Sequence, residues 1–208
     1  MTHVGADRPR TLTVVGAGVI GLCCGLAAAD AGWRVTVLTD PGTPRAADVA
    51  GGMLGSLGEG HPGEDALLEI TADSVRRWPT LLARLDDPAI VSADDSLFVG
   101  VTAADVAFLT QLARFVWSKA VDESVTTRSG LRQVTGREIR ELEPSLGPRA
   151  IGGFLASGEG AVDNRALLAA LETRLVAAGG MVRAHRVDSL TDLPGDRIEF
   201  TVRRLRTA

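Results

Sequence analysis

The segment that most constrains this chain is residues 14–21, Val-Val-Gly-Ala-Gly-Val-Ile-Gly. In this spacing Gly16 permits a tight turn, Gly18 lets a pyrophosphate approach the backbone, and Gly21 lets a helix pack closely on a strand. The N-terminus of that helix then offers free N–H groups to the phosphates. The flanking residues predict a strand over 12–15, a helix over 22–31 and a second strand over 35–38, so the pattern favours Rossmann-type dinucleotide binding.

The same stretch has a competing interpretation. Arg8 and Arg10 precede a nearly uncharged run over 12–29, which superficially resembles a signal peptide with a small-residue cleavage site. The run is also nearly long enough to span a membrane. However, four glycines interrupt it at the spacing of the nucleotide turn, and a β-branched strand follows Gly32 at the distance that a βαβ unit requires. The nucleotide-binding interpretation is therefore favoured.

Composition limits the remaining possibilities. The 208 residues are 45% hydrophobic and 23% charged, which is typical of a soluble globular protein with one large domain or two small ones. The net charge of −4 and the lack of a long basic run argue against nucleic acid as the main partner. No other segment could span a membrane, so no membrane partner is expected and a cytoplasmic location is the default expectation.

Cysteine and histidine indicate neither a disulfide framework nor a metal site. The two cysteines, Cys23 and Cys24, are adjacent on the first helix, where neighbouring side chains diverge. We expect both to be small apolar fillers at the contact between helix and sheet. The three histidines, His3, His61 and His185, lack metal-ligand spacing, so no metal is predicted.

Further elements follow from hydrophobic periodicity and from Gly and Pro positions. A long glycine-rich loop over 45–63 precedes a helix that starts near Glu64 and should be kinked at Pro79. Strands are predicted within 89–101 and over 151–156 and 181–187. Helices are predicted over 103–119 and 137–142, and a further helix is capped by Asp163.

The end of the second strand leaves two roles open for Asp40. A carboxylate at this point usually binds the ribose hydroxyls of an adenosine. Thr39 occupies the favoured position, and side-chain direction alternates along a strand, so Asp40 could face away. Asp40 could instead reach round as the strand ends, or initiate the turn before Pro41.

The loop over 45–55, Arg-Ala-Ala-Asp-Val-Ala-Gly-Gly-Met-Leu-Gly, resembles the flavin-contacting loop of the glycine oxidase family. That family belongs to the D-amino-acid-oxidase-like, FAD-dependent flavoproteins and often serves thiazole synthesis for thiamine. The resemblance extends over residues 11–190 and includes Glu59, Trp78-Pro79, the Leu-Glu-Pro at 142–144 and the Val-Asp-Asn-Arg at 162–165.

The resemblance implies an α/β fold with a Rossmann-like FAD-binding domain and an inserted, incomplete α+β substrate domain. Residues 1–77 and 150–208 would form the discontinuous FAD-binding domain, and residues 78–149 part of the substrate-binding domain. It also implies a homo-oligomer, a tetramer in the family.

Carried over position by position, the resemblance implies contacts with FAD. Val19 and Ile20 would touch the phosphates, and Thr39 and Asp40 fall where the family usually has a ribose-binding glutamate. Ala46 and Ala47 replace hydroxyl residues, which leaves only backbone N–H groups for the pyrophosphate. The complete predicted set is Gly16, Gly18, Val19, Ile20, Gly21, Thr39, Asp40, Ala46, Ala47, Gly51, Gly52, Met53 and Val187.

Two parts of this set lie far from the first turn. Gly51, Gly52 and Met53 would pass beside the isoalloxazine ring, since glycines allow a backbone to lie against a flat ring, although an ordinary flexible loop is the alternative. The backbone of Val187 would pair with the adenine. No catalytic side chain can be nominated, and Arg76, Arg77 and Arg114 are expected on solvated helix faces rather than on a substrate carboxylate.

The implied reaction is hydride transfer from the Cα of glycine or a similar small amino acid to the flavin. Hydrolysis of the imine then gives the oxo acid and ammonia, and oxygen is reduced to hydrogen peroxide. Family members are longer and carry a substrate-binding arginine, and in several a tyrosine, in their second half, whereas this chain has no tyrosine. Because residues 198–206 depart from the family pattern, we expect a truncated member.

Two other hypotheses stay open at this point. The chain could be a binding module that retains dinucleotide affinity without turnover. It could also be an NAD-dependent dehydrogenase, which the glycine-rich loop after the second strand disfavours.

Overall fold

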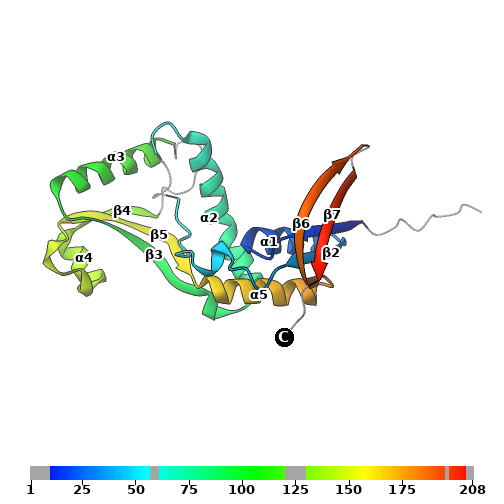
Figure 1. Cartoon of the computed structure of the whole chain (residues 1–208). Coiled ribbons are helices and arrows are strands. Elements are labelled where there is room, and N and C mark those ends of the chain that lie inside the picture. The colour runs from blue at the N-terminus through cyan, green and yellow to red at the C-terminus, as the bar shows by residue number, and fades with distance from the viewer. Residues whose placement is uncertain (1–9, 57–60, 120–129, 195–196, 205–208) are drawn as a thin grey trace, which may run out of the picture. The chain divides into compact units, whose positions relative to one another are not determined.

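A computed structural model describes residues 10–56, 61–119, 130–194 and 197–204 (Figure 1). The chain divides into two compact units, of which the first combines residues 1–50 with 164–208 and the second comprises residues 51–163. The domain boundaries expected at 77/78 and 149/150 fall inside the second unit. Each unit is described by itself below.

The first unit is built on a four-stranded sheet of order β1-β2-β6-β7. Its strands are β1 (Thr11–Val15), β2 (Arg34–Thr39), β6 (Met181–Leu193) and β7 (Arg197–Arg204). The first three run parallel, with Leu12 opposite Val35 and Val37 opposite Val182. Parallel strands joined through helices are the architecture predicted from the glycine motif, so the α/β, Rossmann-like fold class is confirmed.

Helices α1 (Val19–Asp30) and α5 (Asn164–Ala177) pack on each other and on this sheet. Gly25 makes the close contact of α1 with the sheet possible, because a Cβ there would lie 3.3 Å from a methyl group of Val37. The core of this unit consists of the buried side chains of Leu22, Leu26, Val35, Val37, Leu38, Leu167, Leu168, Leu171 and Leu175.

The apolar run over 12–29 is therefore divided between a strand and a helix, which contradicts its interpretation as one membrane-spanning segment. None of the helices in the described part of the chain has the length and apolar character needed to cross a membrane. The expectation for the cysteines is half correct. Cys23 is partly buried, and burial raises the pKa of its thiol, but Cys24 is exposed.

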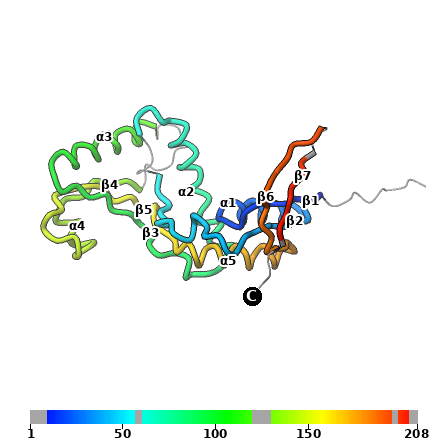
Figure 2. Tube along the Cα trace, in the orientation of Figure 1, coloured from blue at the N-terminus to red at the C-terminus, as the bar shows by residue number. Residues whose placement is uncertain are grey.

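Residues 197–204 form a strand that the sequence did not predict. Residues 197–204 pair antiparallel with β6, with Leu190 opposite Phe200 and His185 opposite Arg204. Figure 2 shows the two strands running side by side as a hairpin. Apolar and polar residues alternate over 198–203, as in a strand with two unlike faces, but both faces are exposed here, including Ile198 at 64%.

The second unit contains a three-stranded antiparallel sheet of order β3-β5-β4. Its elements are α2 (Asp65–Leu85), β3 (Val91–Gly100), α3 (Ala103–Lys119), β4 (Leu131–Thr135), α4 (Gly136–Leu142) and β5 (Gly152–Val162). The short turns η2 (Pro88–Ile90) and η4 (Pro144–Arg149) connect them. The helix expected from Glu64 begins at Asp65, includes Pro79 and continues to Leu85.

Helix α3 covers one face of this sheet, as Figure 1 shows. Phe154 of β5 lies at the centre of the contact, 1% exposed, with the ring of Trp117 edge-on at 5.9 Å between centroids. Leu68 of α2 joins the same cluster, which also includes Leu112, Ala113, Val116, Leu131 and Ala156.

Candidate dinucleotide-binding site

The glycine turn between β1 and α1 has the geometry that its sequence predicts. Gly16 adopts φ +104°, which only glycine adopts without strain. Its N–H donates to the carbonyl of Leu38 at 2.8 Å, so the turn is tied to the end of β2.

Gly18 and Gly21 are glycines for different reasons. A Cβ on Gly21 would lie 2.1 Å from the carbonyl oxygen of Gly16, so the helix could not approach the strand with any side chain there. A Cβ on Gly18 would meet nothing within 4 Å, and its φ of −77° suits every residue. Nothing among the described residues therefore requires glycine at position 18, whereas a ligand close to the backbone would.

Helix α1 begins at Val19 and directs its first N–H groups toward this turn. The first helical hydrogen bond runs from Leu22 N–H to the carbonyl of Gly18 at 2.9 Å, so the N–H groups of residues 19–21 have no partner within the helix. Ile20 is 77% exposed in this first turn. Such a helix end favours an anion electrostatically and by hydrogen bonding.

A cavity of about 330 Å³ lies where β1 and β2 end and β6 passes beside them. This volume is in the range of small-molecule sites, and ligands of open parallel sheets bind at the carboxyl ends of the strands. Five of the predicted site residues line the cavity together, namely Gly16, Gly18, Thr39, Asp40 and Val187.

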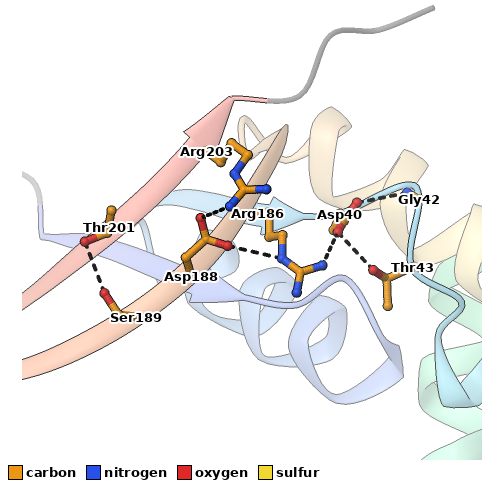
Figure 3. Close-up of polar contacts among 8 residues, drawn as sticks. All are labelled: Asp40, Gly42, Thr43, Arg186, Asp188, Ser189, Thr201 and Arg203. Atoms are coloured by element: carbon orange, nitrogen blue, oxygen red, sulfur yellow. Dashed lines mark hydrogen bonds and ion pairs between the residues drawn. The ribbon is translucent and has the colours of Figure 1, made fainter.

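Asp40 fulfils the turn-initiating role that the sequence left open. Its carboxylate accepts hydrogen bonds from Gly42 N–H and from the Thr43 hydroxyl, both at 2.9 Å (Figure 3). Nη1 of Arg186 lies 3.1 Å from the same carboxylate. The Thr43 hydroxyl, then the Gly42 N–H and Arg186, lower the pKa of Asp40 below its ordinary value.

Arg186 belongs to a chain of charges that the sequence did not reveal. Its Nε lies 3.2 Å from Asp188, and Asp188 also pairs with Arg203 of β7 at 3.1 Å. Figure 3 shows Arg186 between the two carboxylates, with Ser189 and Thr201 paired farther along the hairpin. Arg186 lines the cavity, so this network places a guanidinium beside Asp40, one of the two residues predicted to bind a ribose. No local motif marks it, because its partner Asp40 is 146 residues away.

His185 adds a further polar group to the cavity wall. Its Nδ1 is the buried side-chain atom that lacks a hydrogen-bond partner in the part of the chain that the structure describes. Buried polar atoms are normally paired, so an unpaired nitrogen beside a cavity is consistent with a group that a ligand satisfies.

Arg45 connects the glycine turn with the loop after β2. Its Nη1 donates to the carbonyl of Ala17 at 3.2 Å, and its Nη2 lies 2.9 Å from Asp48. The hydrogen bonds from Arg45 lower the pKa of Asp48. Ala46 and Ala47 lie in the short turn η1 (Ala46–Asp48), which this pair fixes. Arg45, Asp48 and Ala17 also line a second hollow of about 500 Å³ beside Thr39 and Asp40.

The remaining predicted site residues, Gly51, Gly52 and Met53, belong to the second unit. Gly52 adopts φ +75°, and Met53 is 77% exposed and bridges to Ala161. The segment is thus attached to β5 rather than free, which argues against an ordinary flexible loop. Contact of this segment with a flavin stays a prediction.

Other residues singled out from the sequence do not join these groups. Arg76 and Arg77 both pair with Asp73 on the exposed side of α2, and Arg114 is exposed on α3. Glu59 and His3 lie outside the described residues. Within the described ranges, no group of three or more histidine, cysteine, aspartate or glutamate side chains could hold a metal ion.

A protein-family model matches most of this chain. The family model described as DAO, FAD dependent oxidoreductase, matches residues 11–207. The match includes residues 197–204, so the expectation that the resemblance ends before this tail was wrong. Comparison with curated proteins gives no significant match.

Solved structures with the same fold include several oxidases. Glycine oxidase from Geobacillus kaustophilus has a TM-score of 0.75 at 24% identity, over 91% of this chain and 50% of that one. Iminodiacetate oxidase from Chelativorans sp. BNC1 has a TM-score of 0.74 at 19% identity, over 95% and 53%. L-alpha-glycerophosphate oxidase from Mycoplasma pneumoniae, solved with FAD bound, has a TM-score of 0.77 at 15% identity, over 97% and 51%. The chain spans about half the length of these structures.

Proposed function

Because the chain belongs to the DAO family of FAD-dependent oxidoreductases, we propose that it serves the FAD-dependent oxidative deamination of a small amine or amino acid, with glycine as the first candidate. The products would be the oxo acid, ammonia and hydrogen peroxide, with oxygen as the second substrate. The proposal includes a homo-oligomeric enzyme, a tetramer by resemblance, that supplies thiazole synthesis for thiamine.

One observation carries the proposal. The cavity at the ends of β1 and β2, beside β6, is lined by Gly18, and a Cβ at this position would meet no atom of the described residues within 4 Å. Beside it lie the free N–H groups of α1 and the unpaired Nδ1 of His185. A phosphate group would lie against the backbone of Gly18 and accept hydrogen bonds from the N–H groups of α1. An adenosine toward β6 would lie beside His185.

The individual residues then have distinct roles. Val19 and Ile20 present backbone N–H groups to the phosphates. Thr39 and the Asp40–Arg186 pair hold the ribose side, where the family has a glutamate. The backbone of Val187 lies against the adenine, and Ala46 and Ala47, held by Arg45, contribute backbone N–H groups only.

FAD, when bound, would supply the two-electron acceptor for the substrate C–H bond. The segment Gly51–Met53 would lie beside its ring system. Glycines at 51 and 52 carry no side chain that would keep a planar ring from the backbone, while Met53 presents an exposed apolar side chain.

The test starts from the absorbance spectrum of the purified protein and from titration of the apoprotein with FAD. Glycine, sarcosine and small D-amino acids are then added in turn, with peroxide release and anaerobic bleaching of the flavin as readouts. The proposal expects a yellow protein that a small amine bleaches.

Three results would contradict it in different ways. A colourless protein that binds adenine nucleotides without turnover would be a binding module. Tight binding of NADH without flavin would indicate a dehydrogenase. A flavoprotein that no small amine reduces would refute the substrate class while leaving the cofactor assignment intact.

A further inference from the structure

The segment from Gly52 to Ser56 is attached to the last residues of β5. Val162 N–H donates to the carbonyl of Gly52, and Leu54 N–H donates to the carbonyl of Gly160, each at 2.9 Å. Between these bonds Met53 forms an antiparallel bridge with Ala161. The segment thus adds a short strand to β5.

A buried carboxylate closes this attachment. Glu159, the residue of β5 before Gly160, is 5% exposed, and Ser56 is fully buried. One carboxylate oxygen accepts the N–H of Ser56 at 3.0 Å, and the other accepts its hydroxyl at 2.7 Å. Hydrogen bonds to a charged acceptor are the stronger kind, and removing a partner from a buried carboxylate is costly.

The neighbouring chain fits both the side chain and the backbone of Glu159. A Cβ on Gly55 would lie 2.9 Å from one carboxylate oxygen of Glu159, so glycine at this position makes room for it. On the opposite side the hydroxyl of Ser96 in β3 donates to the carbonyl oxygen of Glu159. The backbone of Glu159 is therefore fixed to the sheet while its side chain holds the loop.

We propose that Glu159 is the positioning residue that sets the location of the Gly51–Met53 segment against the flavin. The inference rests on the proposed function for the presence of the flavin, and on the contacts above for the role of the carboxylate. Glu159 holds Ser56, which lies three residues after Met53, and the ladder to β5 carries that constraint back to Gly52. Without the carboxylate, the segment would keep its two backbone hydrogen bonds to β5 and lose both hydrogen bonds at Ser56.

The experiment compares Glu159→Ala with Glu159→Gln in the FAD-bound protein. Alanine removes both acceptors. Glutamine keeps an oxygen for the N–H of Ser56 and presents its NH₂ to the serine hydroxyl, so it preserves the geometry and removes only the charge. We expect Glu159→Ala to shift the flavin absorption band. We also expect it to slow the reduction of the flavin by glycine about a hundredfold, because displacing reacting groups by about 1 Å has an effect of this size. The Kd for FAD should stay unchanged, and Glu159→Gln should restore both readouts.

Amide hydrogen exchange of the apoprotein gives an independent readout. Exchange at Leu54 and Ser56 should accelerate in Glu159→Ala and stay near the wild-type rate in Glu159→Gln. If Glu159→Ala fails to fold, Ser56→Ala replaces it. This variant removes one donor and leaves the carboxylate in place, and it should shift the flavin band in the same direction by a smaller amount.

The outcomes separate this inference from the proposed function. A wild-type protein that takes up no flavin refutes the proposed function, and the positioning role with it. A wild-type flavoprotein whose spectrum, reduction rate and loop exchange are unaffected by Glu159→Ala refutes the positioning role alone. A loss of FAD affinity and thermal stability in parallel, without rescue by glutamine, shows a purely structural role and also overturns it.

Discussion

Nη1 of Arg186 lies 3.1 Å from a carboxylate oxygen of Asp40, although 146 residues separate the two in sequence. The pair joins the end of β2 to β6 at the wall of the cavity, where Asp40 also accepts the hydrogen bonds that fold the turn after β2 (Figure 3). Asp40 is thus a structural acceptor first, and any ribose must be recognised by the pair and not by a free carboxylate.

Replacing Arg186 with glutamine should lower the unfolding temperature slightly at pH 7, because Asp40 loses a cationic partner. Asp40 has a lowered pKa in the folded protein, so its ionised carboxylate stabilises the fold. This stabilisation is present above the ordinary pKa and disappears as the pH falls through the lowered pKa. The difference in unfolding temperature between the variant and the wild type should therefore become smaller in acid. Thermal unfolding at several pH values measures this difference. Arg183→Gln on the same strand is the control, because the described contact of Arg183 is with the sulfur of Met181.

The two glycines of the turn should respond oppositely to alanine. Gly18→Ala should leave the unfolding temperature unchanged and weaken FAD binding about tenfold, the equivalent of one hydrogen bond to a charged group. Gly21→Ala should destabilise the fold by about 1–3 kcal/mol, because its Cβ would overlap the carbonyl of Gly16. Flavin fluorescence titration and urea unfolding separate the two effects. Unchanged FAD affinity in Gly18→Ala would mean that Gly18 has no role in ligand binding.

Arg45→Met should weaken FAD binding by about threefold to tenfold, because the loop over 46–48 loses its attachment to the carbonyl of Ala17. Limited proteolysis should also cut the loop faster in the variant. Arg77→Met serves as the matched control, since Arg77 also pairs with an aspartate close in sequence, on the exposed side of α2. Unchanged FAD affinity in Arg45→Met would show that residues 46–48 do not contact the cofactor.

The start of α4 predicts a pH-dependent stability in the second unit. Glu138 accepts the N–H of Thr135 at 2.8 Å and the hydroxyl of Thr135 at the same distance, and Arg132 lies 2.7 Å away. These contacts lower the pKa of Glu138 from 4.5 to about 2. A lowered pKa stabilises the fold above the unfolded value of 4.5, and this contribution is lost between 4.5 and about 2. Glu138→Gln should therefore unfold at a lower temperature at pH 7, and the gap should narrow below pH 4.5. A gap that is constant with pH would contradict the assignment.

Local patterns were sufficient to predict the first strand, helix and strand, because glycine spacing and apolar periodicity act within about 30 residues. They also predicted α3 and the start of α2 to within one residue. The strands β4 and β7 were missed. Leu131–Thr135 is short and contains several polar residues, and it becomes a strand through its pairing with β5. In residues 198–203 apolar and polar residues alternate, and this segment becomes a strand through its pairing with β6.

For the candidate site, too, the sequence predicted the residues that a local pattern or the family resemblance marks. The glycine turn, Thr39, Asp40 and Val187 were found because family resemblance and strand ends mark them, and they line one cavity. Arg186, Arg45 and Glu159 were not found. Each is an ordinary charged residue in sequence, and each gains its role from a tertiary contact, up to 146 residues away. Cys24 shows the reverse error, since the apolar run around it predicted burial and its helical position turns it outward.

The third strand of the nucleotide-binding sheet, β6, is separated from β2 in the sequence by a whole structural unit. Thr36 of β2 pairs with Met181 of β6, and residues 51–163 between them form a unit of their own. During synthesis, the intervening unit is complete before β6 has been made, so it can fold while the β1–α1–β2 segment still waits for its partner. The cavity is lined in part by His185, Arg186 and Val187 of β6, so it cannot be complete until this strand has been translated, and a cofactor can be bound there only after that point.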